Sequence, residues 1–263
     1  REQKFYQYLF FKQWLDIKAY CNRKNITVFG DLPIYVAYDS ADVWAHPNYF
    51  KLDENREMEK VAGVPPDYFS ETGQLWGMPV YNWENVKNDS FRWWVERVRQ
   101  NFKLYDMIRI DHFRGFSAYW EVDASEKTAV NGKWVPGPGT GLFNKFREEL
   151  GDKPIVAEDL GVITPDVVAL KNQYHFPGMK ILQFGFNKGW GSGHIPHHNE
   201  PNSVVYTGTH DNNTLIGWYK EELDKATRRR ISKYMGKRLR KSNVNELFIK
   251  MAYISTANRA IVP

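Results

Sequence analysis

The sequence predicts an α/β fold, namely a (β/α)8 TIM barrel of which this chain holds roughly strands 3 to 8. Six short apolar segments alternate with helical segments, an order that is typical of βαβ units and a parallel sheet. Three of these apolar segments are followed, directly or within a few residues, by acidic residues, as barrel strands are where they end at an active site. No Gly-rich turn follows the first apolar segment, as a doubly wound nucleotide-binding sheet would require, so the barrel is favoured.

The elements of the first half follow from the spacing of apolar residues. A first helix ends near Asn22, with an apolar face of Tyr6, Leu9, Phe10, Trp14, Ile17 and Cys21. Residues 26–29 form the first expected strand, and residues at about 31–88 form a long loop insertion rich in Pro and Gly. Asn88 or Asp89 caps the next helix, whose apolar face is Phe91, Trp94, Val95, Val98 and Phe102. The strand Met107–Ile110 follows.

The second half continues the alternation after a Gly/Pro-rich connection over residues 136–141. A short helix with Leu142, Phe143, Phe146 and Leu150 precedes the strand Ile155–Ala157. Thr164 and Pro165 have the residue types of an N-cap and a first helical position. Two further strands are expected over residues 179–186 and 204–206, and the last over residues 260–262, after a helix with Ile231, Tyr234, Met235 and Leu239.

Length and composition describe a globular protein of 263 residues and 30.9 kDa, with 42% hydrophobic and 25% charged residues. The single cysteine, Cys21, excludes a disulfide framework and an all-cysteine metal site. No apolar run reaches the length of a membrane span, so we expect no membrane association. We expect residues 1–263 to belong to a single catalytic barrel domain whose upstream strands and C-terminal end are missing, because the first residues already have helix character.

The net charge of +5 comes from the end of the chain, where residues 220–263 hold 12 Lys and Arg but 4 Asp and Glu. A basic cluster can indicate nucleic-acid binding. Here apolar residues such as Ile231 and Tyr234 alternate with the basic ones at helical spacing. An amphipathic helix on the outside of a barrel explains that pattern, and we expect no nucleic acid among the partners.

Acidic residues end three of the expected strands: Asp111 after Met107–Ile110, Glu158 after Ile155–Ala157, and Asp211 shortly after residues 204–206. In a parallel barrel these strand ends share one face, so the carboxylates would converge. Mutual repulsion opposes such a cluster unless phosphate, metal or glycoside chemistry requires it. Alternatively each acid caps a helix or pairs with a neighbour, as Arg109 could pair with Asp111. For three segments together, and with many aromatic residues in loops that suit sugar rings, this alternative is the weaker one. Phosphate, metal and glycoside chemistry all remain open at this point.

The motifs around these acids are similar to signature regions of the 4-alpha-glucanotransferases (amylomaltases, or disproportionating enzymes) of the alpha-amylase clan. The matching segments cover nearly the whole chain and are residues 30–36, 39–47, 63–77, 106–116, 155–161 and 206–214. The resemblance implies a (β/α)8 barrel that transfers alpha-1,4-glucan segments between a donor and an acceptor by a retaining double displacement. It implies no cofactor and a cytoplasmic location, or a plastid if the source is plant-like.

The resemblance also implies roles for individual residues. Asp111 would be the nucleophile, Glu158 the acid/base, and Asp211 a third carboxylate that stabilises the distorted transition state. The implied substrate-binding residues are Arg109, which would also hold Asp111 ionised, together with Asp31, His112, His210, Tyr68, Phe69 and Trp76. The last three would offer aromatic faces to acceptor sugars. Met78 stands where many family members have Asn, so it is left out of the site.

A weaker pattern of three histidines favours no additional site. His194, His197 and His198 could be metal ligands by residue type, but Pro196 breaks helical spacing and no second cluster accompanies them, so we expect a loop and no metal. The sequence leaves two alternatives to transfer open: an amylase-like hydrolase with the same carboxylates, and an inactive carbohydrate-binding fragment. It does not indicate the oligomeric state.

Overall fold

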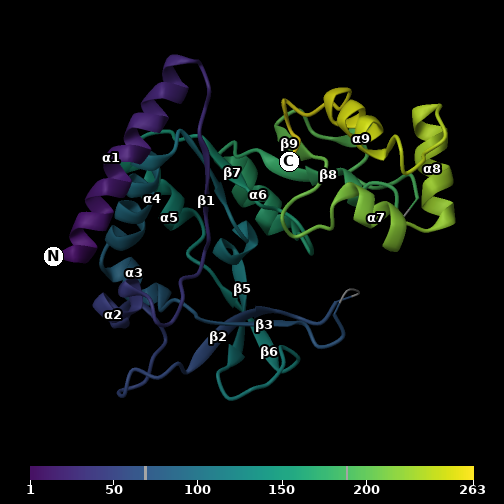
Figure 1. Ribbon diagram of the computed structural model, residues 1–263. Coiled ribbons are helices and arrows are strands. Elements are labelled where there is room, and N and C mark those ends of the chain that lie inside the picture. Colours follow the sequence, from purple (N-terminus) through teal and green to yellow (C-terminus); the bar gives the residue numbers. More distant parts are fainter. Residues whose placement is uncertain (68–69, 188) are drawn as a thin grey trace. The chain divides into compact units, whose positions relative to one another are not determined.

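The chain divides into two units, Arg1–Tyr174 and His175–Pro263. The computed structural model describes residues 1–67, 70–187 and 189–263 (Figure 1). The helices of the first unit are α1 (Glu2–Arg23), α2 (Ala41–Ala45), α3 (Trp83–Asn88), α4 (Arg92–Leu104), α5 (Thr140–Leu150) and α6 (Pro165–Gln173). Its strands are β1 (Phe29–Leu32), β2 (Lys60–Val64), β3 (Gln74–Pro79), β4 (Met107–Ile110), β5 (Ala118–Asp123), β6 (Gly132–Pro136) and β7 (Ile155–Ala157).

A parallel sheet in the order β1-β4-β7 forms the centre of the first unit. Parallel strands covered by helices are apolar along their length, and Ile108, Ile110 and Val156 are fully buried here. The register aligns Ile110 with Leu32 on one side and with Ala157 on the other. The residues that follow these three positions therefore leave the sheet side by side, at the carboxyl ends of the strands.

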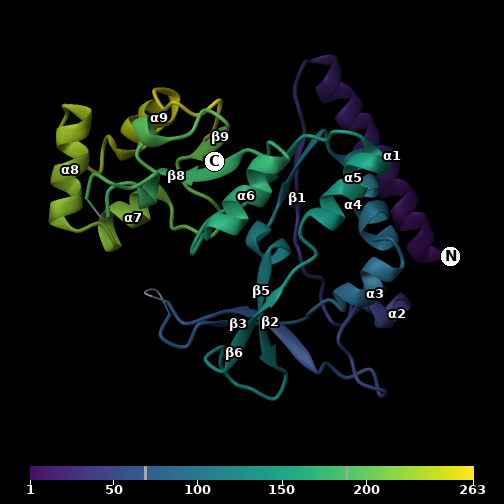
Figure 2. The ribbon, with the colours of Figure 1, turned by 180° about the vertical axis from the view of Figure 1, so that it is seen from behind.

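Helices α1, α4 and α5 lie side by side next to this sheet, as Figures 1 and 2 show from opposite directions. Helix α4 is amphipathic and buries Trp94, Val95 and Val98, and it contacts both β1 and β4. Helix α1 buries none of its residues completely. The apolar face that we expected for α1 is therefore only partly covered in this unit, and Ile17 remains 55% exposed.

A second sheet of the first unit is antiparallel, in the order β3-β2-β5-β6. Glu121 on β5 is 3% exposed and forms an ion pair with Lys51. The expected loop insertion at about 31–88 thus contains elements of its own, namely two of these strands and the short helices α2 and α3. Ser40 caps α2 by accepting a hydrogen bond from the backbone N–H of Val43, and Asn82 caps α3 in the same way.

The second unit contains a three-stranded parallel sheet in the order β10-β9-β8. Its core includes Val205, Trp218, Ile231 and Phe248, all of which are buried. The elements are β8 (Gly178–Ile181), β9 (Ser203–Tyr206), α7 (Leu215–Glu221), α8 (Lys225–Met235), α9 (Val244–Tyr253) and β10 (Arg259–Ile261), with one-turn 3-10 helices at Leu182–Phe184 and Pro196–His198.

Both units confirm an α/β fold with parallel strands, but several expected boundaries are wrong. The first strand is Phe29–Leu32 rather than residues 26–29, because its polar end pairs with β4 instead of forming a turn. Residues 182–184 form a 3-10 helix, so the strand expected over 179–186 ends at Ile181. Helix α8 ends at Met235, where Gly236 adopts a left-handed cap, and Leu239 lies beyond it.

Candidate functional site

Arg109 links two carboxylates at the end of the parallel sheet of the first unit. The strand register places Asp31 on β1 directly beside Arg109 on β4. The Arg109 guanidinium forms two hydrogen bonds of 2.8 Å to the two carboxylate oxygens of Asp31. Its Nη2 atom also lies 2.9 Å from Oδ1 of Asp111, the residue that follows β4. A planar guanidinium fixes both acids in orientation as well as in charge.

Burial makes this arrangement electrostatically strong. The Arg109 side chain is 10% exposed, while those of Asp31 and Asp111 are 47% and 40% exposed. Burial acts to lower the pKa of Arg109, but the hydrogen bonds to Asp31 and the charge of Asp111 outweigh it, so the pKa is raised. Arg109 therefore remains a permanent cation that favours the ionised form of the Asp111 carboxyl group.

Glu158 follows β7 and lies one strand away from Asp111. Its backbone N–H donates to the carbonyl of Ile110, which continues the pairing of β4 with β7. Two backbone N–H groups hold its carboxylate: that of His112 donates to Oε2 at 2.9 Å, and that of Leu160 donates to Oε1 at 2.8 Å. The Glu158 carboxyl group is thus tied to the same turn that carries Asp111.

The environment of Glu158 raises its pKa to about 7, from an ordinary value of 4.5. Burial is the main cause, and the negative charge of Asp111 adds to it. The N–H donors of Leu160 and His112 and the charge of Arg109 act in the opposite direction and limit the rise. Asp111 beside a cation and Glu158 with a raised pKa thus have environments suited to opposite protonation states.

The raised pKa predicts how activity depends on pH. If Glu158 acts as an acid, the first chemical step requires its protonated form, which predominates below about pH 7. We therefore expect kcat/KM to fall as pH rises through about 7. A pH profile of the full-length protein between pH 5 and 9 measures this, and a Glu158→Gln variant should lose the fall in kcat/KM on the basic side of the profile. A kcat/KM that stays flat through pH 7 would contradict the assignment of Glu158 as an acid.

The raised pKa of Glu158 also makes the stability of the folded protein depend on pH. The folded protein binds the Glu158 proton more tightly than the unfolded chain does, so this group makes the folded state less stable as pH rises from about 4.5 to about 7.

His112 turns the chain away from β4 in the left-handed conformation, with φ of 49°. Non-glycine residues are uncommon there, and such strain tends to occur at functional sites. Burial and the charge of Arg114 lower the pKa of His112 to about 4, so its imidazole is neutral near pH 7. Its Nε2 atom is buried and has no hydrogen-bond partner within the described residues. The backbone at position 115 passes close to the His112 ring and requires glycine there, because a Cβ would lie 3.1 Å from that ring and 2.7 Å from Ile34.

Trp76 on β3 packs edge to face against the His112 ring, with their centroids 4.8 Å apart. Its indole N–H donates to the side-chain carbonyl of Gln74 at 3.1 Å. Gly77 follows with φ of 72°, in the left-handed region that favours glycine and strains other residues. The antiparallel sheet thereby brings the Trp76 side chain to the turn that follows β4.

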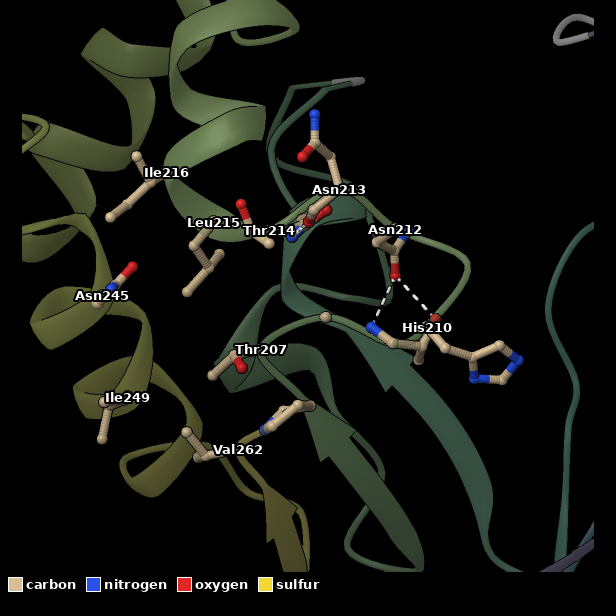
Figure 3. A pocket seen from close by; sticks show the side chains of 14 residues that line it. Thr207, His210, Asn212, Asn213, Thr214, Leu215, Ile216, Asn245, Ile249 and Val262 are labelled. Carbon is tan, nitrogen blue, oxygen red and sulfur yellow. Dashed lines mark hydrogen bonds between the residues drawn. The ribbon is translucent and has the colours of Figure 1, made fainter.

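The second unit positions Asp211 on a loop that follows β9. Asn212 shapes this loop, since its Oδ1 accepts hydrogen bonds from the backbone N–H and the hydroxyl of Thr209, at 2.9 and 3.0 Å (Figure 3). His210 and Asp211 are 71% and 72% exposed, and His210 Nε2 lies 3.4 Å from a carboxylate oxygen of Asp211. Both side chains are therefore free of burial within this unit.

A cavity of about 620 Å³ lies beside the same loop. Its lining combines hydroxyl and amide groups with an apolar wall from Leu215, Ile216, Ile249 and Val262 (Figure 3). The imidazole of His210 points away from this apolar wall. Such a mixture of apolar surface and hydrogen-bonding groups suits a small polar ligand.

The structure brings together five of the residues that the sequence indicated: Asp31, Arg109, Asp111, Glu158 and His112, with Trp76 against the last. His210 and Asp211 adjoin each other in the second unit. Tyr68 and Phe69 lie outside the described residues. Sequence reasoning missed the supporting contacts of Leu160 and of Asn212, although the Thr-x-x-Asn spacing at residues 209–212 is a signal for a side-chain-stabilised turn.

The histidines considered as metal ligands bond to protein groups instead. His194 Nδ1 accepts from the backbone N–H of Ile181 at 3.0 Å, and His198 Nδ1 lies 3.0 Å from the carbonyl of Ser192. His197 lies 3.1 Å from the hydroxyl of Tyr234. Within the described ranges, no three His, Cys, Asp or Glu side chains form a group that could hold a metal ion.

Two arginines of the basic helix α8 donate hydrogen bonds to backbone carbonyl groups of the protein. Arg228 donates to the carbonyl of Tyr219 at 2.6 Å, and Arg230 donates to that of Phe186 at 2.7 Å. These two arginines are half-buried, so only part of the basic face of α8 is exposed to solvent. No helix in the part of the chain that the structure describes is sufficiently long and apolar to cross a membrane.

Comparisons with known proteins agree on one family. The sequence model of a glycoside hydrolase family described as 4-alpha-glucanotransferase matches residues 1–263. The chain is 54% identical over 232 residues to a 4-alpha-glucanotransferase of Streptococcus pneumoniae serotype 4. The aligned residues make up 88% of this chain and 46% of that protein. It is 46% identical over 257 residues to the chloroplastic/amyloplastic 4-alpha-glucanotransferase of Arabidopsis thaliana, covering 98% of this chain and 44% of that one.

Among solved structures, the fold is similar to that of an amylomaltase from Streptococcus agalactiae in complex with acarbose. The TM-score is 0.93 at 44% identity, over 97% of this chain and 52% of that one. The chain thus spans about half the length of the relatives that it matches.

Proposed function

The chain belongs to the 4-alpha-glucanotransferase family, and from this premise we propose that the protein of which it is part transfers alpha-1,4-glucan segments from a donor chain to an acceptor chain. The observation that carries the proposal is the pair of carboxyl groups at the ends of β4 and β7. Asp111 lies against the buried guanidinium of Arg109, while Glu158 has its pKa raised to about 7. One anionic and one protonated carboxyl group are what a retaining glycosidase mechanism needs.

The proposed reaction is a double displacement. Asp111 attacks the anomeric carbon of the donor, and the bond from that carbon to the bridging oxygen breaks as Glu158 gives this oxygen its proton. The ionised Glu158 then takes a proton from the hydroxyl of the acceptor sugar, whose oxygen displaces Asp111 and regenerates both groups. Two inversions at one carbon retain the alpha configuration.

The strand arrangement favours retention over inversion. Neighbouring strands lie about 4.8 Å apart, and the two acids follow register partners on adjacent strands. This spacing is closer to the separation of about 5–5.5 Å in retaining enzymes than to the roughly 6.5–9.5 Å in inverting enzymes, which must accommodate a water molecule.

We assign Asp211 as the third carboxylate, which binds ring hydroxyls as the sugar distorts. Its support is chemical: it is a well-exposed acid beside an imidazole, on a loop at the carboxyl end of a parallel strand. His112 and His210 are assigned to substrate hydroxyls, and Asp31 to the orientation of Arg109 as well as to substrate. Tyr68 and Phe69 are proposed as acceptor-side aromatics on the family pattern alone.

The two parallel sheets are proposed to belong to one (β/α)8 catalytic domain. Two strands of the antiparallel sheet, β2 and β3, come from its insertion at about 31–88, and the other two, β5 and β6, follow β4 in the chain. Alternation of parallel strands with helices supports the single domain, because a parallel sheet must be covered on both faces. The proposed partners are donor and acceptor glucans, and the proposed location is the cytoplasm, or a plastid in a plant-like source, as the name of the Arabidopsis relative says of that protein.

Trp76 is proposed as an aromatic platform for an acceptor sugar. We expect Trp76→Ala to raise KM for the acceptor roughly 2- to 12-fold, which corresponds to the loss of about 0.5–1.5 kcal/mol of ring contact, with a smaller change in kcat. Initial rates at varied acceptor concentration measure this. Trp44→Ala is the matched control, because Trp44 is 77% exposed on α2 and has no place in the proposed site. Equal effects of the two variants would remove Trp76 from the acceptor site.

Incubation of the full-length protein with maltotriose tests the proposed function. Transfer produces glucose together with a ladder of oligosaccharides longer than the substrate, at a constant number of glycosidic bonds. An amylase-like hydrolase, which uses the same carboxylates with water as acceptor, produces only shorter sugars and increases the number of reducing ends. A protein that binds maltotriose and leaves it unchanged would be a carbohydrate-binding protein and would overturn the proposal.

A further inference from the structure

A buried ion pair adjoins Glu158 but has no part in the reaction proposed above. Lys171 Nζ lies 2.6 Å from Oδ2 of Asp159, and the two side chains are 4% and 6% exposed. Breaking such a pair leaves an uncompensated buried charge, so the two groups are held firmly together. Asp159 directly follows Glu158, and Lys171 lies in the last turn of α6.

The ion pair affects the Glu158 carboxyl group because Asp159 is the next residue in the chain. Both hydrogen bonds to the Glu158 carboxyl group come from backbone N–H groups, and one of them belongs to Leu160. Asp159 is the residue between the acid and that donor. An anchor on the Asp159 side chain therefore fixes the short backbone segment that aims the Glu158 carboxyl group.

The cation is itself held in place, because α6 is anchored along its length. Its first turn receives a hydrogen bond from the hydroxyl of Ser117 to Asp166, and Val167 and Leu170 are buried in the core. A mobile lysine could not position a neighbour, whereas one on a packed helix can.

We propose that Lys171, acting through Asp159, is a positioning residue that keeps the Glu158 carboxyl group within reach of the glycosidic oxygen. The inference rests on the proposed function, in which Glu158 gives its proton to that oxygen. Small displacements of an acid from its reacting atom are costly, since a misplacement of about 1 Å can cost about 100-fold in rate. Loss of the ion pair should therefore impair proton donation more than it impairs binding or nucleophilic attack.

The test compares two donors in the full-length enzyme. Maltotriose has a leaving group that needs a proton, whereas alpha-maltosyl fluoride releases fluoride without one. For Lys171→Met we expect kcat with maltotriose to fall about tenfold or more with little change in KM. The first-turnover burst of fluoride should stay close to that of the wild type. Lys171→Arg, which keeps the charge, should recover most of the activity on maltotriose.

Lys51→Met is the matched control, because it breaks the ion pair with the buried Glu121 on β5. It should lower the unfolding temperature without changing the ratio of activities on the two donors. Should Lys171→Met fail to fold, Asp159→Asn and Lys171→Arg supply the same comparison.

Equal losses on both donors, or no loss on either while only stability falls, would overturn the positioning role and leave the proposed function intact. A wild-type enzyme that makes no longer oligosaccharides from maltotriose would overturn the proposed function, and the inference with it.

Discussion

An Asp111→Asn variant of the full-length protein is expected to lose glucan transfer almost completely, by a factor of about 10,000 or more. The amide has the shape of the carboxyl group but lacks the charge that attacks the anomeric carbon. Asp111 lies 2.9 Å from Arg109 and is 40% exposed, so the variant should fold with its neighbours in place. Initial rates of glucose release from maltotriose measure the loss, and thermal unfolding checks the fold.

Asp123→Asn is a suitable control for this variant, because it makes the same chemical change in a carboxylate of similar exposure outside the site. Asp123 is 48% exposed and pairs with Lys60 at 2.8 Å in the antiparallel sheet. It should retain transfer. If Asp111→Asn kept activity within tenfold of the wild type, Asp111 would not be the nucleophile.

A Glu158→Gln variant should have the second largest effect, a loss of about 100- to 10,000-fold with ordinary glucans, the range typical of removing a general acid. The amide can still accept the N–H groups of His112 and Leu160 with its oxygen, but it cannot protonate the departing oxygen. A donor with fluoride as leaving group needs no proton, so it should still glycosylate the enzyme. The burst of fluoride from this donor measures that step alone.

Glu149→Gln serves as the control for the second variant. Glu149 is 41% exposed and pairs with Lys145 at 3.0 Å on α5, so its loss should leave both donors unaffected. If Glu158→Gln were as slow with the fluoride donor as with maltotriose, Glu158 would contribute something other than acid catalysis.

The part of the candidate site that sequence could predict depends on one local rule. An apolar strand that runs into an acid is visible in the sequence at Asp111 and at Glu158, and parallel strands end on the same edge of a sheet. The pairing of Arg109 with Asp111 also followed from residues two apart on a strand that face the same side. These features need only the period of the strand.

Features that depend on register or on long-range packing could not be predicted in this way. The contact of Asp31 with Arg109 arises because β1 aligns with β4 at this position, whereas the strand expected from the sequence, residues 26–29, ends before Asp31. The pairing of Lys171 with Asp159 joins a helix to the strand end twelve residues earlier. Short antiparallel strands with Gly and Pro, such as Gln74–Pro79, resemble loops in sequence because their pairing partners supply the stability.

In the proposed mechanism Asp111 carries the sugar as a covalent intermediate. The most direct test is intact and peptide mass spectrometry of the full-length Glu158→Gln variant after mixing with alpha-maltosyl fluoride. Without an efficient base the second step is slow, so the intermediate should accumulate. We predict an added mass of one maltosyl group, located on the peptide that contains Asp111 and absent from an Asp111→Asn/Glu158→Gln double variant. An adduct on another residue, or fluoride release with no adduct at any time, would show that Asp111 is not the nucleophile.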